Sequence, residues 1–257
     1  MCELFAMSAE GEKRIDEELK EFFSHSTYHP NGWGLMTEQK GLYNWEKEPV
    51  CANESRYLKE RLSEPVIAST ALAHIRYATI GNVSWHNTHP FSAMDKSERL
   101  WTLIHNGTIF DYAPSKHLIR IQKGETDSER ILLYIIEEVN KAIDDAGRDL
   151  NDEERFGIVE RIITSMSSGN KLNIAIFDGS LMYCHTNCAG TLYRKTCDGM
   201  AAISTRPLSF GKWESVPQLK VIAYSKGRLL YEGELISKEY IENPKEIAQL
   251  YLAYSGL

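Results

Sequence analysis

Leu172–His185, which reads LNIAIFDGSLMYCH, decides the fold because two apolar runs flank the dipeptide Asp178-Gly179. An Asp-Gly pair between alternating apolar residues is a strong sequence signal for a two-residue β-hairpin turn. The pattern recurs twice downstream, with turns expected at Asp198-Gly199 and Lys226-Gly227. The strands expected beside these three turns are 172–177, 181–185, 192–196, 200–205, 219–224 and 228–232.

Apolar spacing in the rest of the chain predicts mainly helices. Ile15, Leu19 and Phe22 recur at helical intervals, so we expect a helix near residues 10–24. A capping-box pattern at Thr126–Glu129 opens a long amphipathic helix. The remaining expected elements are helices over 53–62, from Asn151 and from Asn243-Pro244, and strands over 66–78 and 100–105.

The order of these elements favours an α+β fold with antiparallel sheets. Strands occur as hairpins and helices occur in pairs, whereas a doubly wound parallel sheet alternates the two one by one. At 257 residues, the chain fits one large domain or two small ones. Because no internal repeat, low-complexity tract or linker is found, we expect a single domain over residues 1–257.

Composition excludes several classes of protein. Hydrophobic residues make up 42% and charged residues 25% of the chain, as in globular proteins rather than disordered ones. The 29 basic and 36 acidic residues give a formal net charge of −7, which argues against a nucleic-acid partner. No apolar run approaches the roughly 18 residues of a membrane span, and the N-terminus does not resemble a signal peptide. We therefore expect a cytoplasmic protein with five reduced cysteines and no membrane association.

Cys2 is the first candidate for chemistry. If Met1 is removed, the Cys2 thiol and a free α-amine belong to the same residue. Such an amine, with a reference pKa of about 7.7–8.0, can serve as a built-in base for the thiol near neutral pH. The competing interpretation is a small buried cysteine at the start of an edge strand.

Two further motifs offer groups for recognising and activating a substrate. Arg76 leaves an apolar strand on the same face as His74, which suits bidentate capture of a carboxylate, although a structural ion pair explains it equally well. Asn106-Gly107 offers a side-chain amide and a backbone N–H to an oxyanion, each worth about 2.7–4 kcal/mol in a transition state. The same dipeptide is also a strong hairpin signal.

The other polar candidates are weaker. Asp127 lies in the first turn of the expected long helix, where a carboxylate either binds a substrate ammonium group or simply favours the helix dipole. His86 and His89 are better explained as ordinary hydrogen-bonding loop residues than as zinc ligands. No phosphate-binding glycine loop is present, so we expect neither a cofactor nor a metal. The cysteines and histidine that fail to match a standard zinc spacing are Cys184, His185, Cys188 and Cys197.

The order of these motifs resembles that of the class II glutamine amidotransferase domain, a family of N-terminal-nucleophile hydrolases. The matching motifs run from Cys2 to Glu129, about half of the chain. Asn31–Gly34 and Ser204–Leu208 are further similar to the small, stand-alone, YafJ-like branch of that family. The motifs that carry the resemblance are Met1-Cys2, His74–Thr79, Asn87–Phe91, His105–Gly107 and Thr126–Glu129.

The resemblance implies a four-layer αββα sandwich, in which helices cover two antiparallel sheets. It also implies that the Cys2 thiol, with its own α-amine as base, attacks the side-chain amide of glutamine. Ammonia would leave, and water would hydrolyse the resulting γ-glutamyl thioester. The other implied site residues are Asn106 and Gly107 for the oxyanion, Arg76 with Thr79 for the α-carboxylate, and Asp127 for the α-ammonium group.

The chain departs from synthase-linked members of the family in two ways. Ile80 and Gly81 follow the motif where those members usually carry a histidine, and the segment after Leu208 is too short for a synthase domain. Ammonia would therefore pass to a separate acceptor subunit, or the protein would hydrolyse a larger γ-glutamyl conjugate. A non-catalytic binding subunit is the third alternative, if Met1 is retained. The oligomeric state is left open, with a homo-oligomer among the options.

Overall fold

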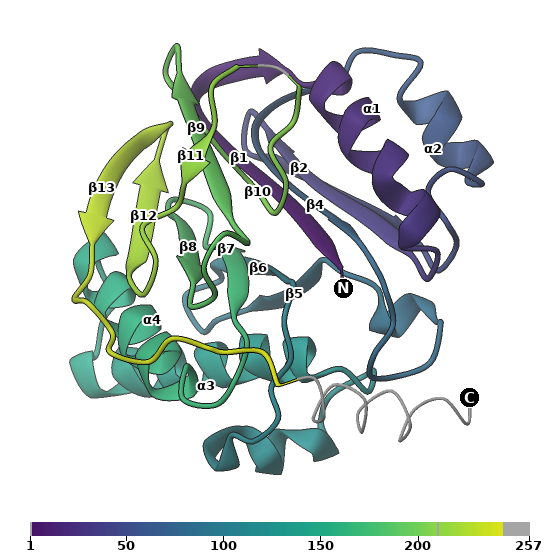
Figure 1. Cartoon of the computed structure of the whole chain (residues 1–257). Coiled ribbons are helices and arrows are strands. Elements are labelled where there is room, and N and C mark those ends of the chain that lie inside the picture. Colours follow the sequence, from purple (N-terminus) through teal and green to yellow (C-terminus); the bar gives the residue numbers. More distant parts are fainter. Residues whose placement is uncertain (1, 210, 244–257) are drawn as a thin grey trace.

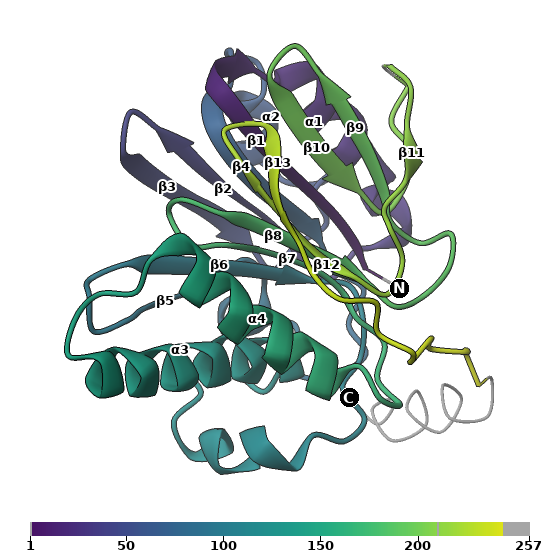
Figure 2. The ribbon, with the colours of Figure 1, turned by 90° about the vertical axis from the view of Figure 1, so that its left-hand side faces the viewer.

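Two antiparallel β-sheets pack face to face between two pairs of α-helices, as a four-layer αββα sandwich (Figures 1 and 2). The computed structural model describes residues 2–209 and 211–243. The strands are β1 (Glu3–Arg14), β2 (Trp33–Gln39), β3 (Leu42–Glu48), β4 (Ile67–Ile75), β5 (Phe91–Met94), β6 (Leu100–His105), β7 (Asn173–Phe177), β8 (Met182–Thr186), β9 (Tyr193–Cys197), β10 (Met200–Ser204), β11 (Glu214–Ser215), β12 (Val221–Ser225) and β13 (Arg228–Glu232). The helices are α1 (Asp16–Ser24), α2 (Arg56–Arg61), α3 (Asp127–Ala146) and α4 (Asp152–Met166), with 3₁₀ helices η1 (His25–Tyr28), η2 (Trp85–Asn87) and η3 (Ala113–Arg120).

The two sheets are built largely from the predicted hairpins. The seven-stranded sheet has the order β11-β9-β10-β1-β4-β2-β3, and the six-stranded sheet has the order β13-β12-β8-β7-β6-β5. The three hairpins β7–β8, β9–β10 and β12–β13 are confirmed. The turn residues Asp198, Gly199, Lys226 and Gly227 all have positive φ, as the tight turns of β-hairpins require.

Three apolar cores separate the four layers. The middle core fills the space between the sheets and includes Leu4 from β1 and Ile104 from β6. A second core joins α1 and α2 to the seven-stranded sheet, and a third joins α3 and α4 to the six-stranded sheet (Figure 2). The predicted α+β class and the αββα sandwich are therefore confirmed.

The two long helices begin where capping predicts. The Thr126 hydroxyl accepts a hydrogen bond from the Glu129 N–H at the start of α3, and Asn151 forms a reciprocal capping box with Glu154 at the start of α4. Helix α3 ends at Gly147, whose φ of 62° is the left-handed conformation common at helix ends. These contacts fix the position of Asp127, the first residue of α3.

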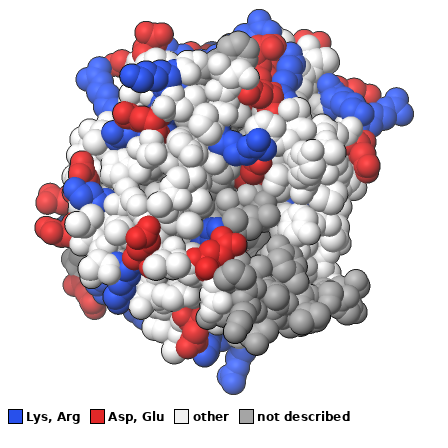
Figure 3. All heavy atoms as spheres, in the orientation of Figure 1, with Lys and Arg blue, Asp and Glu red and all other residues white. Residues whose placement is uncertain are grey.

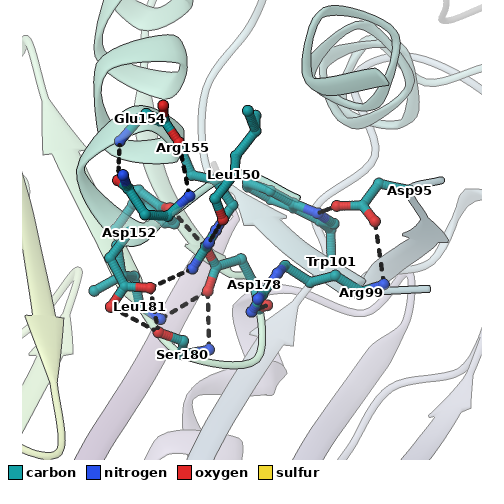
Figure 4. A network of polar contacts seen from close by, with 12 residues as sticks. Asp95, Arg99, Trp101, Leu150, Asp152, Glu154, Arg155, Asp178, Ser180 and Leu181 are labelled. Carbon is teal, nitrogen blue, oxygen red and sulfur yellow. Dashed lines mark hydrogen bonds and ion pairs between the residues drawn. The ribbon is translucent and has the colours of Figure 1, made fainter. Parts of the chain in front are cut away.

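A buried ionic network ties the β7–β8 turn to the start of α4 (Figure 4). The Asp178 carboxylate accepts hydrogen bonds from Arg155 Nε and the Tyr183 hydroxyl, both at 2.7 Å. Its other oxygen accepts the backbone N–H groups of Ser180 and Leu181. Because Asp178 has no exposed surface, these partners replace its lost hydration.

Several sequence expectations differ from the structure. The helix expected near residues 10–24 begins only at Asp16, because β1 continues to Arg14 beyond its buried half, paired with β4 after a register shift. The strand expected over 66–78 is β4, which ends at Ile75. Strands β2, β3 and β5 were not predicted, and the helix expected from Asn243-Pro244 lies mainly outside the described residues.

Within residues 2–209 and 211–243, no helix is both long and apolar enough to cross a membrane. On the face shown in Figure 3, basic side chains are interspersed with acidic and uncharged ones. That face therefore presents no extended surface of a single charge.

Candidate active site

Strand register brings Cys2 and Arg76 together. In the antiparallel pair β1–β4, Leu4 lies opposite His74. Continuing this register by two residues sets Cys2 opposite Arg76, and opposed residues project from the same face of a sheet. Leu4 belongs to the core between the sheets, so Cys2, two residues earlier, also projects toward the inter-sheet space.

The Cys2 sulfur is held by the backbone of Tyr77. The Tyr77 N–H donates to Sγ and the thiol donates to the Tyr77 carbonyl, both at 3.3 Å. Burial raises the pKa of the Cys2 thiol, although the Tyr77 N–H and the Arg76 charge partly offset this effect. The thiol is therefore mainly protonated at neutral pH and needs a base. The edge-strand interpretation is wrong, because β1 is the central strand of its sheet.

Arg76 is a buried cation that forms hydrogen bonds to a loop rather than an ion pair. The residue is 3% exposed, and its guanidinium donates hydrogen bonds to the carbonyls of Ile80, Gly81 and Asn82, each at 2.9 Å. It makes no ion pair with any carboxylate that the structure describes. Burial lowers the pKa of Arg76, and nearby negative charges, including that of Asp127, counter the effect.

The loop that Arg76 holds is fastened on its other side. Glu125 accepts a hydrogen bond from the Asn82 N–H at 2.8 Å and another from the Asn87 side chain at 2.9 Å. Asn87 also donates to the Asn82 carbonyl at 3.0 Å. Thr79 lies half-buried at the start of this loop, directly before Ile80.

Asn106 and Gly107 follow β6 on the opposing sheet. Ile104 belongs to the inter-sheet core, so Asn106, two residues later, projects toward the same space as Cys2. Its backbone N–H donates to the Asn173 carbonyl at 2.8 Å, while its side-chain amide has no hydrogen-bond partner among the described residues. The hairpin interpretation of this dipeptide is wrong, because the chain leaves β6 without turning back on itself.

Gly107 is required by a close backbone approach. A Cβ atom at this position would lie 2.0 Å from the Lys171 carbonyl oxygen and 2.3 Å from His105 Nε2. Any larger residue would therefore push apart the backbones of residues 107 and 171.

Asp127 is a buried carboxylate without a cationic partner in the part of the chain that the structure describes. It is 6% exposed and accepts hydrogen bonds from the N–H groups of Ile109 (2.7 Å) and Ser128 (2.8 Å). The Ser128 hydroxyl lies 3.2 Å from Asp127 and 3.0 Å from His105 Nδ1. This chain of contacts joins the residue before Asn106 to the carboxylate at the helix start. The position of Asp127 in the first turn of α3 also suits the helix dipole, so a role in the helix dipole and a role in binding an ammonium group are compatible.

The imidazole groups of three residues near the site, His74, His89 and His105, are buried. The rings of His74 and His89 are tilted by 31° with centroids 4.0 Å apart, and burial lowers the pKa of His74 to about 3. Both ring nitrogens of His89 lack a hydrogen-bond partner within the described chain. The interpretation of His89 as an ordinary hydrogen-bonding loop residue is therefore wrong. His86, by contrast, is exposed. No cluster of three or more side chains suited to a metal ion occurs among the described residues.

Some contacts at the site were not foreseen. The Asn31 side chain accepts the Ala78 N–H at 2.9 Å, which gives the Asn31–Gly34 motif a role in shaping the segment after Arg76. Tyr77 contacts the Cys2 sulfur through backbone atoms, which leave no residue signature, and Glu125 belongs to no motif. Ser128 lies inside the capping-box motif, which assigns no role to its side chain.

Comparisons with known proteins identify the family. Residues 1–196 match the family described as glutamine amidotransferases class-II. The putative glutamine amidotransferase YafJ of Escherichia coli is 28% identical over 193 residues, covering 73% of this chain and 74% of YafJ. The chain therefore belongs to the class II glutamine amidotransferases.

Solved structures support the same fold. A predicted glutamine amidotransferase from Pseudomonas aeruginosa superposes with a TM-score of 0.66 at 19% identity, covering 90% of this chain and all of that one. Glutamine phosphoribosylpyrophosphate amidotransferase from B. subtilis gives a TM-score of 0.67 at 15% identity, covering 92% of this chain and 49% of that one. At these identities the likeness concerns the fold alone.

Proposed function

We propose that this protein hydrolyses the side-chain amide of glutamine through a γ-glutamyl thioester on Cys2, and releases ammonia. The observation that carries the proposal is the register of β1 and β4, which pairs Glu3 with Ile75 and, continued by one residue, supports Cys2 lying opposite Arg76 on the inter-sheet face. Asn106 comes from the opposing sheet, so nucleophile and oxyanion donors face one space.

The amino-acid end of glutamine is recognised by Arg76 and Asp127. A buried guanidinium without an ion pair fits the α-carboxylate, and a buried carboxylate without a cation fits the α-ammonium group. Three N–H groups of Arg76 already hold the loop of Ile80–Asn82, so the carboxylate takes a remaining N–H with help from the Thr79 hydroxyl.

The reaction requires the free α-amine of Cys2, and so the removal of Met1. The amine takes the thiol proton as sulfur attacks the amide carbon, and the oxyanion is held by the Asn106 side chain and the Gly107 N–H. The protonated amine then gives its proton to the leaving nitrogen, and ammonia departs. Water adds to the thioester carbonyl with the amine again as base, so that glutamate and the thiol are restored.

Steady-state kinetics with two substrates test the proposal. We expect glutamine to be turned over with a kcat/KM at least tenfold above that of a γ-glutamyl dipeptide; because the two substrates share the amino-acid end and the amide carbonyl, this ratio isolates the preference for an unsubstituted amide nitrogen, which leaves as ammonia. Asp127→Asn should raise KM for glutamine, while Cys2→Ala should abolish turnover. A preference for the dipeptide would instead favour a hydrolase of γ-glutamyl conjugates.

Retention of Met1 in the native protein would favour a non-catalytic binding subunit, and the intact mass decides this point. We further propose a cytoplasmic location, which fits five free thiols, and an ammonia acceptor on a separate subunit. Copurification from native extracts tests for that subunit, and its absence under conditions that preserve complexes would favour simple hydrolysis.

A further inference from the structure

A cavity whose lining does not include Cys2 lies where the edge strand β3 of one sheet approaches the edge strand β5 of the other. Its volume is about 280 Å³. The walls come from both edge strands, the segment around η2, the residues before α3 and the first turns of α3 itself. The lining residues of the cavity include Trp45, Lys47, Trp85, Phe91, Lys123 and Glu129.

The walls of this cavity are unusually aromatic for a surface site. Trp85 is 54% exposed and Trp45 is 36% exposed, although tryptophan side chains are normally well covered. Phe91 forms a third aromatic wall. Flat exposed rings around a concave site suit a planar apolar ligand.

The cavity also carries positive charge in a protein whose net charge is −7. Lys47 Nζ lies 4.1 Å from the centre of the Trp85 ring and donates to the carbonyls of Thr88 (2.7 Å) and Pro90 (3.2 Å). Neither Lys47 nor the exposed Lys123 forms an ion pair with a described carboxylate. Burial lowers the pKa of Lys47 to about 8, so it remains mainly charged at neutral pH.

The single carboxylate among the residues that line the cavity belongs to Glu129 and already accepts hydrogen bonds. Glu129 accepts hydrogen bonds from the backbone N–H groups of Lys123 (2.7 Å) and Gly124 (2.8 Å). Glu129 also interacts electrostatically with Lys47 but forms no ion pair with either lysine, so the two ammonium groups share one carboxylate and lack a second anion. An anionic ligand would supply one.

We propose that the cavity between β3 and β5 binds a small aromatic anion, meaning a planar ring that bears a carboxylate, sulfonate or phosphate group. The ring lies against Trp45 and Trp85, and the anionic group faces Lys47 and Lys123. This binding is independent of glutamine hydrolysis, so its test needs no activity measurement.

Indole N–H signals in a ¹H–¹⁵N NMR spectrum of the full chain locate the ligand directly. The five tryptophans give five such signals, which single Trp→Phe variants assign. The probes are 2-naphthoate, neutral 2-naphthamide and the non-aromatic cyclohexanecarboxylate. We expect 2-naphthoate to shift the signals of Trp45 and Trp85 only, with a Kd at least tenfold below that of either other probe.

A pair of lysine variants checks the charge. Lys123→Met should weaken 2-naphthoate binding threefold or more, whereas Lys212→Met, at an exposed position outside the cavity, should leave it unchanged. The proposal is overturned if 2-naphthamide binds as tightly as 2-naphthoate, or if the signals of other tryptophans move instead. It is equally overturned if no indole signal shifts up to the solubility limit of 2-naphthoate.

Discussion

The substitution Gly107→Ala tests whether the oxyanion site depends on one close backbone contact. The added methyl group would lie 2.0 Å from the Lys171 carbonyl oxygen, whereas ordinary contact begins at 3.4 Å. Relief of this overlap therefore needs a displacement of about 1.4 Å between the two backbones.

Two effects follow from such a displacement. The Lys171 carbonyl accepts hydrogen bonds from the Thr108 N–H (3.0 Å) and from His105 Nε2 (3.1 Å), and the movement weakens both. At about 0.5–1.5 kcal/mol each, their loss lowers the free energy of unfolding by about 1–3 kcal/mol. The Gly107 N–H moves with its backbone, and a misplacement of about 1 Å in an active site costs about 100-fold in rate.

The matched control is Gly157→Ala. Gly157 lies in the middle of α4 with nothing within 4 Å of an added Cβ, so alanine should stabilise the helix by about 0.5–1 kcal/mol. Urea denaturation gives the free energies of unfolding, and glutamine hydrolysis gives kcat/KM. The reasoning is refuted if Gly107→Ala matches Gly157→Ala in both measurements.

Three further outcomes are expected. Asp178→Asn should lower the free energy of unfolding by about 3–5 kcal/mol, because it leaves the buried Arg155 charge poorly compensated. Asp152→Asn removes a half-exposed partner of the same arginine and should cost less than about 1 kcal/mol. Similar midpoints of guanidinium denaturation for the two variants would contradict this expectation. Burial lowers the pKa of His74 to about 3 and that of His185 to about 4, so the unfolded state binds more protons below about pH 6.5. Stability should therefore be fully present above that pH and fall as the pH decreases toward 4, and a melting temperature that rises on acidification would contradict this. Arg76→Lys should raise KM for glutamine about tenfold or more while the Cys2 thiol stays reactive toward iodoacetamide, and an unchanged KM would remove Arg76 from substrate binding.

The hairpins and capped helices could be predicted because their signals are local. Asp198-Gly199 and Lys226-Gly227 occupy positions with positive φ, and Thr126 and Asn151 cap helices through side chains within three residues. Strands β2, β3 and β5 were missed because their pairing is set by distant partners, as when Gly34 opposes both Lys47 and His74. Their own sequences carry no clear period.

The candidate site was only partly accessible from the sequence. Cys2, Arg76, Asn106 and Asp127 stand in motifs, yet their common orientation depends on the register of two sheets, which no local pattern encodes. Contacts through backbone atoms, such as that of Tyr77 with the Cys2 sulfur, leave no residue signature.

Labelling the native protein with a diazoketone analogue of glutamine, followed by peptide mass spectrometry, probes the nucleophile itself. If the first residue carries both the reactive sulfur and its base, the labelled chain should lack Met1 and carry one adduct, on Cys2. An unlabelled Met1-free chain, or an adduct on Cys51 in its place, would contradict the account.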